Sequence, residues 1–417
     1  MVMLVLSRRH LFHYRSAGFW AWCAVSLYFL VTPAIQLNGD LSYLETRLAL
    51  TEGLPRMEWV TLCVAMGIAV FFLAYFVTKP GHPNFGLTQE TWPTGTWIII
   101  ILAMLSAAYS LIIFRGAFGY ETPAYTIVNG RYVQGDTGYG TVMHTFALFP
   151  IVLLFSRRST RLLGVALVGL FIWGRLEDTM DRATSVSLLL AISIADTYRR
   201  RRRWPHWAFI VIALLFTLFI QARGHTGFAQ FRESGRSIVS ASEEEVARGE
   251  GAVMLSTLYL KTYLADNGGY TYGLNIISQS LFGALPRKYF PWKSWLEDEY
   301  GKVDLSQVYG SEFLTGAKHT VIGDLYGCGS IIAIIIGMPI LGFLTRKLDG
   351  FLSPQSPMLV RTMGICWAST LWLSFGSGVS WAFCQVYLYA VPFVAIVLLT
   401  YVLSPKTTHR GVRVLAR

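Results

Sequence analysis

The chain has few charged residues and few cysteines. Asp, Glu, Lys and Arg make up 14% of it, whereas a soluble domain carries about 25%. None of the five cysteines has CxxC spacing. We therefore expect neither a disulfide framework nor a zinc site formed by cysteines. We expect the cysteines to be small buried hydrophobic residues. The sequence also lacks internal repeats and low-complexity tracts.

Apolar residues are abundant, at 53% of the chain. They form runs of roughly twenty residues between short polar stretches, which is typical of membrane helices. Backbone polar groups in lipid must be bonded internally, so each run should be helical. The sequence therefore predicts an all-α fold, a polytopic membrane bundle of about ten transmembrane helices. The predicted spans are Ala17–Ile35, Glu58–Thr78, Trp97–Phe114, Tyr139–Ser156, Leu162–Trp173, Ala183–Asp196, Trp207–Ile220, Val321–Leu344, Met358–Gly376 and Trp381–Leu403.

Three of these spans have an alternative interpretation: the two shortest ones and the first one. Leu162–Trp173 and Ala183–Asp196 have only 12 and 14 residues, so whether they cross the bilayer completely stays open. The first span could instead be a signal peptide. The absence of a small-residue cleavage site after Ile35 argues against that interpretation.

The distribution of charge predicts the orientation of the bundle. With ten spans, the segments on the side of the N-terminus hold 19 of the 35 basic residues and only 3 of the 24 acidic ones. The opposite segments hold the remaining 16 basic and 21 acidic residues. The positive-inside rule then places both termini in the cytoplasm. The basic run Arg199–Arg203 lies in a tight loop between two spans. The positive-inside rule therefore explains this run better than nucleic-acid binding does.

The spans divide the chain into three regions. A seven-helix membrane region, 1–220, precedes a large outer-face loop, 221–318, and a three-helix membrane region, 319–417, follows. A structured connection of about 98 residues is usually functional. Within it, Met254–Ala265 and Tyr272–Leu285 are expected to be helices that lie at the membrane interface or pack on the spans.

A basic and aromatic segment of the loop, PRKYFPWK, is the first candidate binding site. It contains Arg287, Lys288 and Lys293 together with Tyr289 and Trp292. Its two prolines restrict the backbone on either side of the cluster. The planar guanidinium suits phosphate and pyrophosphate, and the aromatic rings offer flat faces to a sugar. Headgroup contacts by single arginines and an interfacial aromatic belt are the alternative interpretations.

Two further groups of polar residues flank predicted spans on the outer face. Arg175 and Arg182 bound the short acidic loop between the fifth and sixth spans, where they could pair with its carboxylates or face a cavity. His319 precedes the eighth span, and its imidazole could accept a proton from a hydroxyl. Asp324 lies five residues further on and needs a partner or water at that depth. Lys318 and the outer arginines are its candidate partners.

These motifs resemble a known family. Arg182-Ala183 opens a span after a short outer loop, PRKYFPWK lies late in a large outer loop, and HTVIGDLYGCGS begins the next span. The chain in this respect resembles the bacterial oligosaccharide repeat-unit polymerases of the O-antigen polymerase type, which are related in architecture to the O-antigen ligases. The topology resembles that of the family over the whole chain. The matching motifs cover only about Arg175–Ala183 and Tyr272–Gly337.

The resemblance implies an integral-membrane glycosyltransferase of the bacterial inner membrane that makes a surface or exopolysaccharide. Its donor and acceptor would be glycans on undecaprenyl pyrophosphate at the periplasmic face, with membrane lipids and a chain-length regulator as possible further partners. No cofactor or metal is implied. Arg182 and Arg287 match arginines that bind pyrophosphate in the family, and His319 matches a histidine that activates the acceptor in the ligases. Arg182 is followed by alanine instead of the commoner glycine.

Three other functions stay open from the sequence. A ligase would use the same donor and a different acceptor. A flippase or transporter for the lipid-linked unit should have polar breaks near mid-bilayer and two related halves, and the sequence shows neither. A receptor or scaffold without catalytic activity is the last alternative.

Overall fold

The computed structural model describes most of the predicted spans and parts of the segments between them. The described residues are 13–31, 33–34, 53–81, 97–102, 104–105, 108, 125–128, 131–134, 137–176, 182–209, 211–212, 215, 258–259, 261–267, 269–282, 292 and 320–403.

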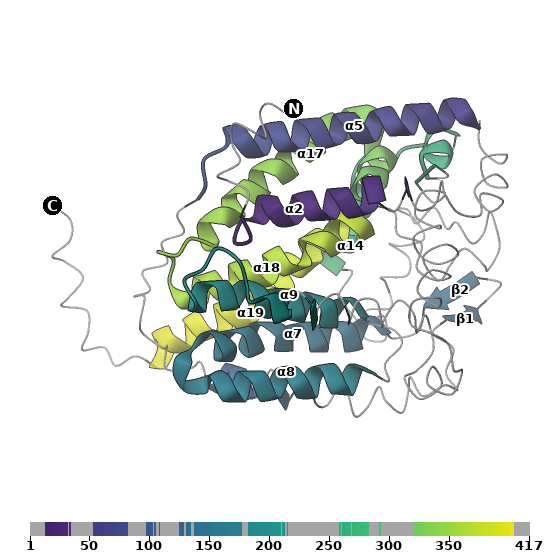
Figure 1. Cartoon of the computed structure of the whole chain (residues 1–417). Coiled ribbons are helices and arrows are strands. Elements are labelled where there is room, and N and C mark those ends of the chain that lie inside the picture. Colours follow the sequence, from purple (N-terminus) through teal and green to yellow (C-terminus); the bar gives the residue numbers. More distant parts are fainter. Residues whose placement is uncertain are drawn as a thin grey trace, which may run out of the picture.

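The described part of the chain is a bundle of helices that run side by side (Figure 1). The long helices coincide with predicted spans, so the prediction of a helical fold is confirmed. Their bounds are α2 Ala17–Ser26, α5 Leu54–Val77, α7 Thr137–Ser156, α8 Arg161–Leu176, α9 Arg182–Arg199, α14 Leu274–Phe282, α17 Thr320–Phe351, α18 Met358–Ser377 and α19 Val379–Leu403. A π-helical turn, Leu27–Val31, extends α2, and a 3₁₀ turn, Arg158–Thr160, precedes α8.

One element departs from the all-α prediction. Strands β1 (Tyr125–Val128) and β2 (Arg131–Gln134) pair antiparallel, with Val128 opposite Arg131. The two residues between them in the sequence are Asn129 and Gly130, which is the strongest short-range signal for a tight hairpin. The hairpin lies between the third and fourth predicted spans.

Two hydrophobic cores hold the bundle together. Helix α18 contacts α2, α7, α9, α17 and α19 and so lies at the centre. The first core gathers side chains of α7, α9, α18 and α19, such as Leu148, Leu188, Cys366 and Phe393. The second joins α2 to α5 and α17 through side chains such as Tyr28, Phe71 and Met338.

Helices α5 and α17 pack closely because a glycine lies at their contact. A Cβ atom at Gly342 of α17 would overlap the backbone carbonyl oxygen of Phe71 in α5. Any larger residue at this position would therefore force the two helices apart.

Two described helices, Pro55–Val77 and Thr320–Phe351, are long and apolar enough to cross a membrane. Only 39% and 28% of their most apolar windows are buried within the bundle, whereas the core helix of a soluble protein is mostly buried. Large apolar side chains such as Leu73 (53% exposed) and Ile332 (66% exposed) point outward from them. The count of ten crossings stays a prediction, because among the described residues only these two helices meet the criteria of length and composition.

Candidate functional site

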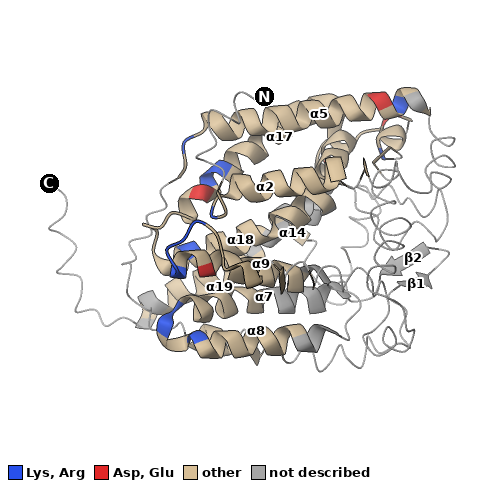
Figure 2. Cartoon of the chain, in the orientation of Figure 1, with Lys and Arg blue, Asp and Glu red and all other residues tan. Residues whose placement is uncertain are grey.

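Charged residues of the described part of the chain gather at the two ends of the bundle (Figure 2). One end, here called the basic end, holds the C-termini of α5, α9 and α17 and the start of α18. The opposite end, here called the loop end, holds the starts of α5 and α17 and the described residues of the large loop. Contacts between helix ends fix this arrangement. Arg346, near the end of α17, contacts Thr78 just after α5, and Asp324, near the start of α17, contacts Val379 at the start of α19, so α5, α17 and α19 run in the same direction.

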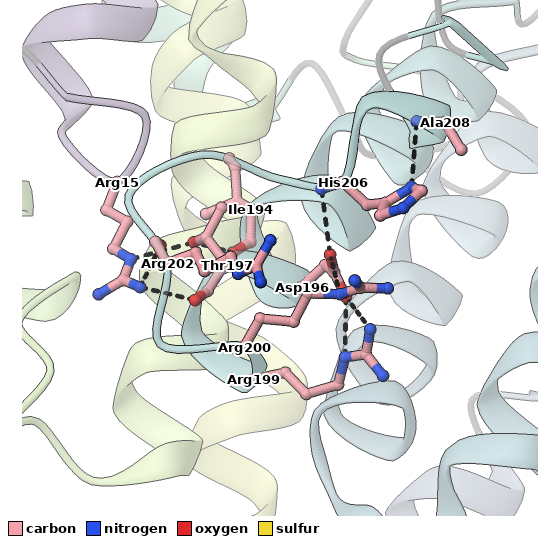
Figure 3. Close-up of polar contacts among 9 residues, drawn as sticks. All are labelled: Arg15, Ile194, Asp196, Thr197, Arg199, Arg200, Arg202, His206 and Ala208. Atoms are coloured by element: carbon pink, nitrogen blue, oxygen red, sulfur yellow. Dashed lines mark hydrogen bonds and ion pairs between the residues drawn. The ribbon is translucent and has the colours of Figure 1, made fainter.

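At the basic end, Asp196 organises the turn that follows α9 (Figure 3). Its buried carboxylate accepts hydrogen bonds from Arg199 (Nε, 2.8 Å) and Arg200 (Nε, 3.2 Å). The backbone N–H of His206 also donates to it, at 3.4 Å. A single carboxylate therefore binds two arginines and folds the basic segment back on the bundle, and a net positive charge remains.

A second carboxylate of the basic end joins three helices. Asp349 of α17 accepts hydrogen bonds from the backbone N–H of Ala17 at 2.7 Å, from the Tyr75 hydroxyl at 2.6 Å and from Arg346 at 2.7 Å. These three hydrogen bonds explain how α2, α5 and α17 are held together at the basic end.

The loop end has a buried ion pair between the large loop and α17. Lys261 Nζ lies 2.5 Å from Asp324 Oδ1, and the two side chains are only 11% and 4% exposed. The other oxygen of Asp324 accepts a hydrogen bond of 3.0 Å from the backbone N–H of Val379, the first residue of α19. A carboxylate at a helix N-terminus is favoured by the exposed N–H groups and the helix dipole. Asp324 thus joins three segments that are distant in the sequence.

Three glycines lie against this ion pair. A Cβ atom at Gly323 or Gly327, four residues apart on one face of α17, would lie 3.6 or 3.4 Å from carbons of the Lys261 stem. Gly378 has φ +107°, and a Cβ atom there would overlap the Asp324 carboxylate. The distances at Gly323 and Gly327 are ordinary van der Waals contacts, so Gly378 is the position at which this ion pair requires a glycine.

A second ion pair lies beside the first. Arg56, near the start of α5, pairs with Asp266 of the loop. The hydroxyls of Tyr326 and Tyr270 donate to the same carboxylate, at 2.9 and 2.5 Å. Trp59 of α5 in turn donates its indole N–H to Tyr326 at 2.9 Å. The loop residues 261–267 are therefore fastened to both α5 and α17.

The environment of Asp266 keeps it ionised. Burial acts to raise the pKa of this carboxyl, but the hydrogen bonds from Arg56, Tyr270 and Tyr326 and the charge of Arg56 outweigh it. The pKa of Asp266 therefore lies below its usual value. The hydrogen bond to this carboxylate in turn raises the pKa of Tyr270.

Helix α17 is broken just beyond these contacts. Ser330 has φ +58°, in the left-handed region. The carbonyls of Gly327 and Cys328 accept hydrogen bonds of 3.0 Å from the backbone N–H groups of Thr271 and Tyr272. The loop thus donates hydrogen bonds to the backbone carbonyls that the break leaves without partners in the helix. Buried polar groups need such partners.

The structure describes only some of the residues that the sequence singled out. Asp324 has a partner, as expected for a carboxylate at that depth, but the partner is Lys261 and not one of those proposed from the sequence. Trp292 is 43% exposed and packs edge-on against Phe282 at the end of α14, with ring centroids 5.0 Å apart. The remaining candidates of the loop, Arg287, Lys288, Tyr289, Lys293 and His319, lie outside the described residues.

The two arginines of the short outer loop are described by their backbone alone. Arg175 is in the last turn of α8, and Arg182 is the first residue of α9. Since α9 ends at the basic end, its first residue lies at the loop end, as does Thr320, the residue after His319. The helices thus bring these positions to the same end of the bundle, while the directions of the arginine side chains are not described.

Sequence reasoning missed Arg56, Lys261 and Asp266. Lys261 lies within the predicted helix Met254–Ala265 and Asp266 directly follows it, and charged residues on and beside such a helix usually face water. The available signal was the pair of glycines, Gly323 and Gly327, on either side of Asp324 in the sequence, whose lack of side chains lets a neighbouring segment approach α17.

Among the described residues, no group of three or more His, Cys, Asp and Glu side chains is arranged to hold a metal ion. Comparison of the chain with protein-family models, curated proteins and solved structures found no match.

Proposed function

We propose that the chain is a multi-pass protein of the bacterial inner membrane, with about ten spans and both termini in the cytoplasm. The separation of charge supports this orientation, because Arg and Lys dominate the basic end and the large loop joins the opposite end. Exposed apolar side chains along α5 and α17 support a lipid-facing surface, since a soluble monomer rarely exposes large contiguous apolar patches. The loop end would then face the periplasm.

We further propose that the loop end is the active site of a membrane glycosyltransferase. It would polymerise oligosaccharide repeat units carried on undecaprenyl pyrophosphate into a surface polysaccharide. The observation that carries the proposal is the buried Lys261–Asp324 pair. It fastens the large loop, which contains the basic PRKYFPWK segment, to the helix that begins directly after His319.

The reaction follows from the chemistry of the donor. The hydroxyl of the acceptor unit attacks the anomeric carbon of the donor glycan, and a glycosidic C–O bond forms. The bond between that carbon and the phosphate oxygen breaks, and undecaprenyl pyrophosphate leaves with the electron pair. His319 takes the proton of the attacking hydroxyl. A single in-line displacement inverts the anomeric centre.

Arginines have the main electrostatic role in this scheme. Negative charge grows on the leaving phosphate in the transition state, so guanidinium groups already in place stabilise that state more than the ground state. Arg182 and Arg287 are proposed for this role. Arg175, Lys288 and Lys293 would hold the second phosphate, and Tyr289 and Trp292 would lie against the sugar.

Within this site, Asp324 would act by position. Both of its oxygens are engaged, by Lys261 and by the Val379 N–H, so it is a poor candidate for a base. It would hold the start of α17, and hence His319, in register with the loop.

Incubating the purified protein with lipid-linked repeat units, and separating the products by size on a gel, tests the proposal. We expect a ladder of polymers from the wild-type protein and none from Arg182→Ala or Arg287→Ala, with Arg→Lys variants rescuing poorly. Asn267→Ala, an exposed position of the loop helix, is the matched control and should retain the ladder. Full-length polymer from either arginine variant would refute the proposed role.

A further inference from the structure

A cationic patch at the basic end is not explained by the proposed reaction. The 3₁₀ turn Arg158–Thr160 leads directly into α8, whose first residue is Arg161. Helix α8 packs on α7 and α9, and the charges of both Arg199, at the end of α9, and Arg158 act on Arg161. Because α8 begins and α9 ends at the basic end, and the two helices are in contact, three arginines from two connections of the chain gather at this end.

This patch has an excess of positive charge. Asp196 is the carboxylate that attracts Arg161, but its oxygens already bind Arg199 and Arg200. The Nε atom of Arg161 is buried and has no hydrogen-bond partner among the described residues. Burial lowers the pKa of the Arg161 guanidinium, and the charges of Arg199 and Arg158 lower it further. An anion between these arginines would supply the missing acceptor and relieve their repulsion.

The surroundings of the patch are those of a bilayer surface. Leu162 and Val165, on the turn of α8 after Arg161, are 86% and 51% exposed. Trp204 and Trp207, in the segment after α9, are 55% and 68% exposed. Tryptophan is enriched where helices meet lipid headgroups. The arginines thus lie at the boundary between an outward apolar surface and a polar one.

We propose that Arg158, Arg161 and Arg199 form a binding site for the phosphate of an anionic phospholipid of the cytoplasmic leaflet. The phosphate accepts hydrogen bonds from the guanidinium groups, and the acyl chains lie along the exposed face of α8. Basic pockets between helices on the cytoplasmic side are suited to such headgroups. The site rests on the membrane orientation proposed above and is independent of glycosyl transfer.

The test measures lipid binding to the full-length protein after delipidation in detergent. Native mass spectrometry and the unfolding temperature are followed while phosphatidylglycerol, cardiolipin or phosphatidylcholine is added. We expect the two anionic lipids to bind and to raise the unfolding temperature, while phosphatidylcholine does neither. In Arg158→Gln/Arg161→Gln, anionic lipid should bind roughly 30-fold more weakly, if each arginine contributes about fivefold.

The matched control is Arg202→Gln/Arg203→Gln, which removes the same charge from exposed side chains of the same end. It should weaken binding only a few-fold, because those charges act through the screened field of the solvent. Inorganic phosphate at the same concentration should not raise the unfolding temperature, since it lacks the acyl chains. The proposal is overturned if the control variant loses binding equally, if phosphatidylcholine binds as tightly, or if inorganic phosphate alone gives the same stabilisation.

Discussion

Removing one partner of the Lys261–Asp324 pair should detach the loop helix from α17. Lys261→Met leaves the Asp324 carboxylate, 4% exposed, without its cation, and loss of one partner of a buried pair costs about 3–5 kcal/mol. The loop residues 261–267 depend on this contact and on Arg56. A loss of about 3 kcal/mol corresponds to roughly 10²-fold more frequent local opening.

Amide hydrogen exchange measures this opening directly. Exchange at residues 261–267 should accelerate by about that factor in Lys261→Met, whereas the middle of α18 should be unaffected. Asn267→Ala, on the same helix but exposed, is the control and should change exchange only slightly.

A double-mutant cycle separates the pair from the two single side chains. Asp324→Asn should also loosen the loop, although its amide oxygen can still accept from the Val379 N–H. The double variant Lys261→Met/Asp324→Asn removes both charges at once, so its effect should fall short of the sum of the single effects by about 2 kcal/mol. Strictly additive effects would show that the two side chains do not interact, and the reasoning from the ion pair would then fail.

Two further predictions concern the loop end, and a third concerns the orientation of both ends. Gly378→Ala should destabilise the loop end by about 1–3 kcal/mol, seen as a lower unfolding temperature, because Gly378 has φ +107° and its new Cβ would meet Asp324; an unchanged temperature would contradict this. Because the pKa of Asp266 is lowered in the folded state, its contribution should be complete above the ordinary carboxyl pKa of about 4 and be lost as the pH falls through the folded value. Exchange at residues 261–267 should therefore stay slow at pH 5, and acceleration already between pH 7 and pH 5 would refute the assignment. In intact cells, a membrane-impermeant thiol reagent should label Asn267→Cys and not Arg203→Cys, and the reverse pattern would invert the proposed orientation.

The helices could be predicted from the sequence because each depends on a local pattern. The runs of apolar residues predict α5, α17 and α18, and most of the predicted helix ends lie within a few residues of the observed ones. The two short spans were underestimated, since α8 and α9 have 16 and 18 residues and extend into flanking polar residues. A span predicted from hydropathy ends at the first charged residues, whereas the helix itself continues until its backbone hydrogen bonds end.

The contacts of the loop end could not be predicted, because they join residues far apart in the sequence. Lys261 and Asp324 are separated by 63 positions, and Arg56 and Asp266 by 210. No periodicity within one segment encodes such a pair. The need for a partner of Asp324 was predictable from the cost of an isolated charge, but the identity of that partner depends on how the loop folds back.

The hairpin and the break in α17 were missed for a different reason. The Asn129-Gly130 pair and the Gly329-Ser330 pair are both local signals, of a tight turn and of a helix interruption respectively. Gly329-Ser330 lies inside a predicted span, where the apolar pattern predicts one continuous helix. Asn129-Gly130 lies in a connection between two predicted spans, where the apolar pattern predicts only a loop.

We propose that the loop end transfers a glycan from a lipid pyrophosphate to a hydroxyl. The most direct test of this proposal is to count, in one reaction of the purified protein, the glycosidic bonds formed and the undecaprenyl pyrophosphate molecules released. Glycosyl transfer requires one lipid released for each new bond, with inversion at the anomeric carbon. Release without bond formation, or movement of the lipid-linked unit across a vesicle membrane with neither, would contradict the account.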